Sequence, residues 1–109
     1  MVTSIKTWHN AKQHCIEMGA RLMEIRTQEE FETALRFKEE LGGLWLGGND
    51  LQQHGNWVWD SNNEQVSLNE FWRIGNPTGV INRDCLSLAF DRMTNWSCST
   101  GYASVCEYN

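Results

Sequence analysis

The positions of four cysteines constrain this fold more than any other feature of the sequence. Cys15 lies 70 residues before Cys85, which is followed closely by Cys98 and Cys106. No C-x-x-C pair is present, so no common zinc motif fits, and a disulfide framework from an oxidising compartment is the better interpretation. Any bridge from Cys15 must close most of the chain into one covalent loop, although the sequence alone permits three pairings.

Length and charge restrict the chain to one small domain that does not bind nucleic acid. Its 109 residues allow one hydrophobic core, and we expect a single domain over residues 1–109. A net charge of −5 with scattered Lys and Arg excludes a basic phosphate-binding face. No apolar run approaches the roughly 18 residues of a membrane-spanning helix. The first residues lack a signal-peptide pattern, so we expect either that Met1 is not native or that the chain begins at the mature domain.

Two helices are predicted in the first half of the chain. Thr7 caps the first, in which apolar residues recur at helical spacing until Gly19 ends it. The segment Thr27-Gln28-Glu29-Glu30 is a capping box that opens the second helix, and Gly42 ends it. The apolar positions that the second helix is expected to bury are Phe31, Ala34, Leu35 and Leu41.

The rest of the chain has the pattern of short strands and one long loop, so the expected class is α+β. Residues 60–84 show almost no periodicity and contain many Asn residues. A loop of about 25 residues inside a compact domain is usually functional, so we expect the binding surface there. Strand character is found at residues 1–4, 20–25, 44–47, 57–59, 85–90 and 102–108.

Ten short motifs and single residues give the chain a resemblance to a known family. They are Trp8-x-x-Ala11-x-x-x-Cys15, Gly19-Ala20-Arg21-Leu22, Trp45-Leu46-Gly47-Gly48, Trp57-Val58-Trp59, Phe71-Trp72, Asn76-Pro77, Asp84-Cys85, Trp96, Cys98 and Val105-Cys106-Glu107. In this order the chain resembles a C-type lectin domain of the short, four-cysteine form. The resemblance implies two helices with small antiparallel sheets and a long loop region. It also implies the disulfides Cys15–Cys106 and Cys85–Cys98.

Sugar-binding members of that family hold calcium in the long loop, and this chain matches their primary site poorly. By the resemblance, Asn76-Pro77-Thr78 stands at the Glu-Pro-Asn or Gln-Pro-Asp tripeptide, and Arg83 stands at an acidic ligand. The segment Trp96-Ser97-Cys98 is too short for the Asn-Asp pair of the family. Ca²⁺ takes about six to eight oxygen ligands, several of them anionic. We therefore expect no metal at the primary site.

The auxiliary calcium site that the resemblance implies is also incomplete. Asp50 and Asp84 match two of its acidic ligands, but His54 and Gly79 stand where two others would be. Asp50 and Asp84 are thus weak candidates for an auxiliary calcium ion, and no cofactor is expected to be required. The histidines show no ligand spacing, and only His54 lies near this candidate ion.

The polar loop residues have two alternative roles. Arg83 is expected either to donate its fixed fork of N–H groups to a sugar or to pair on the surface with Asp84 or Asp91. Asn76 and Asn82 either exchange hydrogen bonds with sugar hydroxyls or stabilise turns. The candidate sugar-binding residues are Asn76, Thr78, Asn82, Arg83 and Asp84.

Two classes of function are predicted, and catalysis is not one of them, because no serine stands in a nucleophile-elbow motif. We favour a secreted, calcium-independent lectin of the kind found in innate immunity. It would bind a monosaccharide, such as an N-acetylated sugar, in a carbohydrate or glycoconjugate by direct hydrogen bonds. Homo- or hetero-oligomers would give it avidity. The alternative is a calcium-independent lectin-like module that binds a protein or ice.

Overall fold

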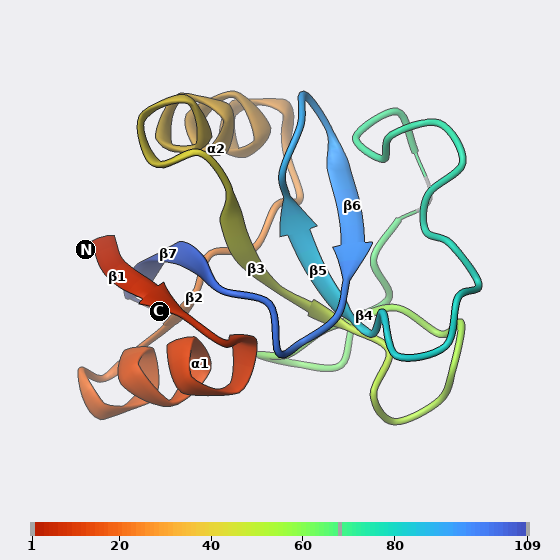
Figure 1. The fold of residues 1–109 in the computed structure, drawn as a ribbon. Coiled ribbons are helices and arrows are strands. Elements are labelled where there is room, and N and C mark those ends of the chain that lie inside the picture. Colours follow the sequence, from red (N-terminus) through yellow and green to blue (C-terminus); the bar gives the residue numbers. More distant parts are fainter. Residues whose placement is uncertain (1, 68, 109) are drawn as a thin grey trace.

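The computed structural model describes residues 2–67 and 69–108 and has an α+β architecture (Figure 1). Helices α1 and α2 lie on either side of the strands, and the loop between β4 and β5 projects away from both termini. No described helix is long and apolar enough to cross a membrane. The elements are β1 (Val2–Lys6), α1 (Trp8–Glu17), β2 (Ala20–Leu22), α2 (Gln28–Leu41), β3 (Leu44–Asn49), β4 (Val58–Trp59), β5 (Cys85–Leu88), β6 (Met93–Trp96) and β7 (Tyr102–Tyr108).

The strands form one mixed sheet in the order β1-β7-β3-β5-β6, to which β2 and β4 add at β7 and β3. Most neighbours are antiparallel, but β3 and β7 run parallel, with Leu44 opposite Ala103. The expectation of antiparallel sheets is therefore wrong at this pair. Parallel strands need a long crossover connection, and here the chain between β3 and β7 includes the long loop, β5 and β6.

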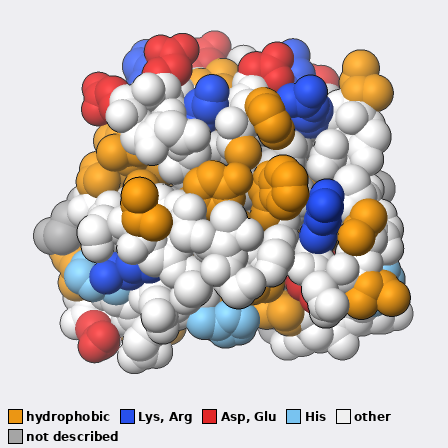
Figure 2. Space-filling model, in the orientation of Figure 1, with side chains coloured by type: hydrophobic (Ala, Val, Ile, Leu, Met, Phe, Trp, Pro, Cys, Tyr) orange, Lys and Arg blue, Asp and Glu red, His pale blue; other side chains and the backbone are white. Residues whose placement is uncertain are grey.

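Both helices form where local capping and apolar spacing predict them. In α2 the hydroxyl of Thr27 accepts from the Glu30 amide at 3.1 Å, and the Glu30 carboxylate accepts from the Thr27 amide at 3.0 Å. This confirms the predicted capping box, and Gly42 ends the helix at a φ of +82°. Charged side chains gather over α2 on the solvent side (Figure 2). Its inner face buries Phe31 and Ala34 and partly buries Leu35 and Leu41.

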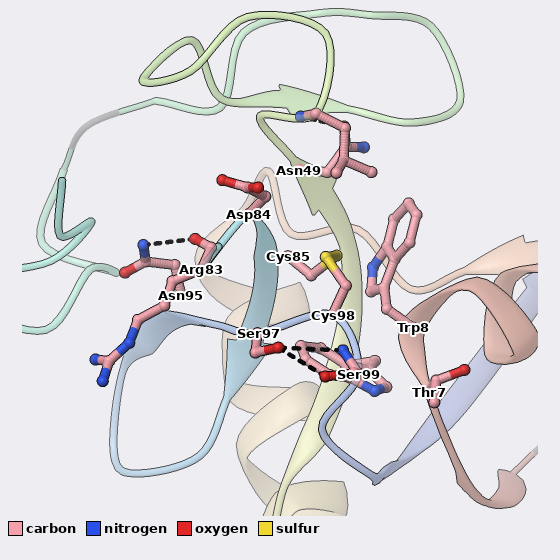
Figure 3. Close-up of a disulfide and its surroundings, with 12 residues drawn as sticks. Thr7, Trp8, Asn49, Arg83, Asp84, Cys85, Asn95, Ser97, Cys98 and Ser99 are labelled. Carbon is pink, nitrogen blue, oxygen red and sulfur yellow. Dashed lines mark hydrogen bonds between the residues drawn. A yellow bond between two sulfur atoms is a disulfide. The ribbon is translucent and has the colours of Figure 1, made fainter. Parts of the chain in front are cut away.

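Two disulfides hold the elements together as the resemblance implied. Cys15–Cys106 joins α1 to β7, with a Cα–Cα distance of 5.4 Å. Cys85–Cys98 joins the start of β5 to the segment after β6, at 5.2 Å. Because Cys85 directly follows the long loop, the second bridge fixes the backbone at the point where that loop re-enters the sheet (Figure 3).

The long loop has no described helix or strand, as predicted, yet it is anchored in the core. Three of its own apolar residues, Val66, Phe71 and Trp72, are buried. The Phe71 ring stacks on Phe31 of α2 at a centroid distance of 4.6 Å, and Trp72 meets Trp57 edge to face at 5.6 Å. These ring contacts fix the first half of the loop to the core, so the segment from Arg73 onwards starts from an anchored position.

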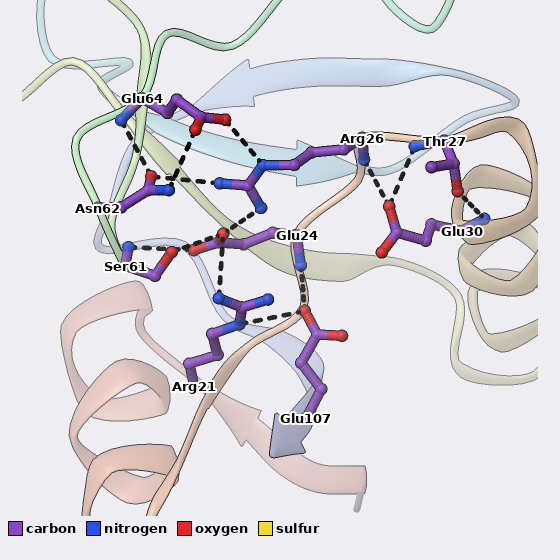
Figure 4. A network of polar contacts seen from close by, with 9 residues as sticks. All are labelled: Arg21, Glu24, Arg26, Thr27, Glu30, Ser61, Asn62, Glu64 and Glu107. Carbon is purple, nitrogen blue, oxygen red and sulfur yellow. Dashed lines mark hydrogen bonds and ion pairs between the residues drawn. The ribbon is translucent and has the colours of Figure 1, made fainter. Parts of the chain in front are cut away.

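A buried carboxylate also fixes the beginning of the loop (Figure 4). Glu24 is 1% exposed, and its oxygens accept from the Arg26 guanidinium at 2.7 Å and from the Ser61 hydroxyl at 2.8 Å. Arg26 also donates to Glu64 at 3.1 Å. A buried charge is tolerated when it is paired and hydrogen-bonded, and here the pairing ties the segment after β2 to the loop after β4.

The main difference from the predicted elements is strand β6, which the sequence pattern did not indicate. Met93, Thr94 and Asn95 are all buried, so the strand lacks polar–apolar alternation. Its polar side chains are satisfied inside the fold: the Thr94 hydroxyl, for example, lies 2.8 Å from the Ser87 hydroxyl of β5. The other strands differ from the predicted ranges at their ends. Met1, in the predicted first strand, lies outside the described residues.

Candidate functional site

The site begins with Asn95, a buried residue of β6 whose side chain reaches into the long loop. Its Oδ1 accepts from the Thr78 amide at 2.9 Å, and its Nδ2 donates to the Thr78 carbonyl at 3.0 Å. Nδ2 also lies 3.2 Å from the Thr78 hydroxyl and donates to the Arg83 carbonyl at 2.8 Å. One carboxamide thus connects two parts of the loop to the sheet.

Arg83 lies against the ring of Trp96 at the end of β6. Its guanidinium carbon is 4.6 Å from the ring centroid, a cation–π geometry that holds the planar group in place. Among the described residues, this ring contact is the one interaction of the guanidinium, which forms neither of the expected ion pairs with Asp84 and Asp91. The expected pairing of Arg83 with either aspartate is therefore not found, and this half-buried residue lies against the Trp96 ring instead.

The other predicted residues lie around this pair in different settings. The Asn76 amide donates to the Arg73 carbonyl at 2.9 Å, while no described residue bonds to its side chain. Asn82 is exposed with a φ of +70°, a left-handed conformation that asparagine tolerates, which favours its role in a turn. The Asp84 carboxylate points to a different side from the Arg83 guanidinium (Figure 3).

The residues at the primary calcium position do not fit that ion. The Thr78 hydroxyl accepts a hydrogen bond from Asn95, and the Asn95 carboxamide oxygen is engaged by the Thr78 amide. No group of three His, Cys, Asp or Glu side chains gathers around Thr78 and Arg83 in the part of the chain that the structure describes. A guanidinium with neutral oxygens cannot provide the anionic oxygen ligands that Ca²⁺ requires.

A different cluster forms where β3 ends. Asp50 is 4% exposed, and its Oδ2 accepts from the Gly55 amide at 2.8 Å. His54 Nδ1 lies 3.7 Å from Asp50 Oδ2 and 3.9 Å from Asp84 Oδ1. Burial raises the pKa of the Asp50 carboxyl, and the neighbouring Asp84 carboxylate adds to the rise. The structure thus brings the two predicted aspartates together and adds His54 to them.

Apolar side chains are exposed on the same loop. Ile74 is 98% exposed, Ile81 76% and Val80 49%. In the space-filling view, separate hydrophobic groups lie along the side of the molecule where the loop projects (Figure 2). They do not merge there into one broad patch.

Sequence reasoning missed Asn95, the residue that organises the site. The resemblance directed attention to the residues after Trp96, whereas the side chain that enters the loop comes one residue before it. In the β5–β6 register Asn95 lies opposite Leu86, so its place depends on a strand that was not predicted. In the sequence, the one hint of a role for Asn95 is its position three residues before Cys98.

Residues 4–108 match the sequence model of the lectin C-type domain. The chain belongs to the C-type lectin domain family. It is 31% identical over 109 residues to human C-type lectin domain family 6 member A, covering 95% of this chain but 52% of that relative. The chain therefore spans about half the length of this relative.

Solved structures of C-type lectins have the same fold. TC14, a C-type lectin from the tunicate Polyandrocarpa misakiensis, superposes with a TM-score of 0.87 at 17% identity, covering 100% of this chain and 97% of that one. A calcium-independent type II antifreeze protein gives a TM-score of 0.76 at 23% identity, covering 94% and 78% of the two chains. The predicted C-type lectin-like α+β fold is confirmed, and this C-type lectin domain belongs to a family of binding proteins, not enzymes.

Proposed function

We propose that this domain is a carbohydrate-binding lectin that recognises a monosaccharide through Arg83 and its surroundings, without calcium at the primary site. The observation that carries the proposal is the stacking of the Arg83 guanidinium on Trp96. The cation lies against an aromatic ring while its hydrogen-bond donors have no described partner. A fixed donor with unused N–H groups loses little conformational entropy when a ligand binds.

Thr78 and Asn76 complete the proposed contacts. The Thr78 hydroxyl accepts from Asn95, so its own proton is free to be donated to a sugar oxygen. The Asn76 carboxamide, with no described partner, can both donate and accept. Asn82 lies on the adjoining exposed turn and would contribute at the edge. We leave Asp84 out of the contact set, because its carboxylate lies beside His54.

An N-acetylated sugar suits these groups best. The carbonyl oxygen of an acetamide can accept both N–H groups from one edge of a guanidinium, and the acetamide N–H can donate to the Asn76 carboxamide. In this arrangement Arg83 supplies the positive charge that a metal ion supplies in a calcium-dependent site. Because one such contact set binds weakly, a homo- or hetero-oligomer would provide avidity. The two disulfides support a secreted, extracellular location, where a role in innate immunity would be exercised.

Isothermal titration of the chelator-treated domain with N-acetylglucosamine, N-acetylgalactosamine, glucose and galactose tests this proposal. Saturable binding to an N-acetylated sugar in the presence of EDTA, stronger than to its parent hexose, is expected. No heat with any of these sugars, under conditions in which the domain is folded, would contradict it.

One observation favours the alternative, a calcium-independent module that binds a protein or ice. Ile74, Val80 and Ile81 are exposed on the same long loop, and exposed apolar side chains are common at binding surfaces. A protein ligand would bury these side chains together with Arg83. Loss of binding to a captured protein on Ile74→Ser and Ile81→Ser substitution, in a domain that shows no sugar binding, would support this alternative over the first.

A further inference from the structure

The cluster formed by Asp50, His54 and Asp84 is separate from the proposed sugar contacts. One ligand atom from each of these residues lies within 4.8 Å of the other two, the one such group among the described residues. The three come from two segments: the loop that follows β3 and the residue that precedes Cys85. The backbone amide of Asp50 donates to the carbonyl of Asp84 at 3.1 Å, so the two segments are already held together.

Asp50 provides a second, independent indication of a ligand. Its side chain is 2% exposed, and its Oδ1 is buried with no hydrogen-bond partner among the described residues. Its other oxygen, Oδ2, is held by the Gly55 amide at 2.8 Å. A carboxylate fixed by one oxygen while the other is buried and unused is costly unless a cation or donor completes it.

The donor set does not fit calcium. Ca²⁺ prefers about six to eight oxygen ligands, and these residues offer two carboxylates and one imidazole nitrogen. Zn²⁺ binds well to a combination of histidine nitrogen and carboxylate oxygen, and three protein ligands with one water complete its tetrahedron. Because the side chain of His54 is 54% exposed and that of Asp84 25%, a fourth position would face solvent.

The two distances from His54 are close to those of a metal site, and all three ligand atoms lie within 4.8 Å of one another. Ligand atoms of a tetrahedral Zn²⁺ site with bonds of about 2.0–2.1 Å lie about 3.3 Å from one another. The imidazole Nδ1 is 3.7 Å from Asp50 Oδ2 and 3.9 Å from Asp84 Oδ1, and its exposed side chain is free to move by that difference. The Gly55 amide would orient the Asp50 carboxylate, as hydrogen bonds to metal ligands commonly do.

We propose that Asp50, His54 and Asp84 form a binding site for a borderline divalent ion, Zn²⁺, and that His54 gives this site its preference over Ca²⁺. The ion would tie the loop after β3 to the start of β5. It would therefore stabilise the backbone next to Arg83 without contacting the sugar.

Titration of the metal-stripped full chain with ZnCl₂ and, separately, with CaCl₂ tests the proposal by calorimetry and thermal unfolding. One Zn²⁺ per chain with a rise in melting temperature is expected, and Ca²⁺ at equal concentration should bind at least about tenfold more weakly. His54→Ala should weaken Zn²⁺ binding by about tenfold or more, because one of three ligands is lost. His54→Glu should reverse the preference toward Ca²⁺, since it adds a third carboxylate.

His14→Ala is the matched control, because this half-buried histidine of α1 lies outside the cluster. It should leave Zn²⁺ binding within about twofold, as expected for a residue that is not a ligand. Equal Zn²⁺ affinity in the parent and in His54→Ala would overturn the proposal, as would tighter binding of Ca²⁺ than of Zn²⁺ by the parent. Co²⁺ gives a check on the unsubstituted chain: a four-coordinate visible spectrum supports the site, and an aquo-ion spectrum contradicts it.

Discussion

The side chain of Asn95 brackets the peptide unit of Thr78, accepting from its amide at 2.9 Å and donating to its carbonyl at 3.0 Å. The same Nδ2 donates to the Arg83 carbonyl at 2.8 Å. This one residue therefore sets the separation of the two loop segments that we propose contact the sugar. Asn95 is 2% exposed, so water cannot easily replace these bonds.

Asn95→Asp should destabilise the domain by about 1–3 kcal/mol, because both N–H donors of Nδ2 are lost and each hydrogen bond contributes roughly 0.5–1.5 kcal/mol. In addition, the new carboxylate would face the Thr78 and Arg83 carbonyls. Thermal unfolding at neutral pH should show a fall of roughly ten degrees or more for a domain of this size. Asn10→Asp, at an exposed position in α1, is the control and should change stability by less than about 0.5 kcal/mol. Similar melting temperatures for the parent and Asn95→Asp would contradict this role.

The sequence predicts most of this fold because the signals are local or covalent. The capping box at Thr27 and the left-handed Gly42 are determined by neighbouring residues, and the cysteine pairing followed from the family resemblance. Asn95 and the β3–β7 pairing were missed because they depend on contacts between distant segments. A buried asparagine in a strand without alternation has no local pattern that distinguishes it from a loop residue.

The candidate site was predicted in the same uneven way. Asp50 and Asp84 were identified by the resemblance, which also placed His54 near them, while the distances of His54 from both carboxylates came only from the structure. Arg83 was identified as the unusual residue of the loop, but its contact with Trp96 was not foreseen. Stacking of an arginine on a ring has no fixed sequence spacing, so a single sequence does not reveal it.

Arg83→Ala should weaken binding of an N-acetylated sugar roughly tenfold to a hundredfold, since a charged donor contributes about 1.5–3 kcal/mol. The free energy of unfolding of this variant should fall by only about 0.5–1 kcal/mol, the contribution of an exposed cation–π pair. Arg83→Lys should recover part of the affinity, because an ammonium lacks the planar fork.

The control is Arg73→Ala, which removes an arginine that also lies over a ring, 4.2 Å from the centroid of Phe90. This variant should bind sugar within about twofold of the parent, because it lies outside the proposed contacts. Equal sugar affinity in the parent and in Arg83→Ala, measured by titration calorimetry, would show that the sugar binds to another part of the domain.

Calcium should have little effect on sugar binding. Adding millimolar CaCl₂ to the metal-stripped domain should change the affinity for N-acetylglucosamine by less than about twofold and the melting temperature by only a few degrees. A calcium ion present at about 100 times its dissociation constant would contribute about 2.7 kcal/mol, which for this size is roughly ten degrees or more. A rise of that size, or a tenfold gain in affinity, would show a calcium site that the donor set does not predict.

Glu107 should make the stability of the domain depend on pH. Burial raises the pKa of its carboxyl, against the opposing effects of the Glu24 amide and Arg21. Because the folded state then binds a proton more tightly than the unfolded state, this contribution is present at low pH and is lost as pH rises through the raised pKa. As pH rises above about 4, the region of an ordinary Glu pKa, the free energy of unfolding should therefore fall less steeply in Glu107→Gln than in the parent.

Urea unfolding of the parent and of Glu107→Gln across a pH series measures this difference. The carboxamide introduced by Glu107→Gln retains an oxygen for the Glu24 amide, a contact of 2.8 Å in the parent, so local geometry should be preserved. Identical pH slopes in the two proteins would mean that the Glu107 carboxyl titrates with nearly the same pKa in the folded and unfolded states.

The most direct test of the central claim is an amide and arginine-side-chain NMR titration of the metal-stripped, isotope-labelled domain with N-acetylglucosamine. The account predicts saturable shifts at Thr78, at the Arg83 Nε–H and at the Asn95 side-chain amide, unchanged by EDTA. Shifts confined to residues away from this loop, or binding that appears only after Ca²⁺ is added, would contradict it.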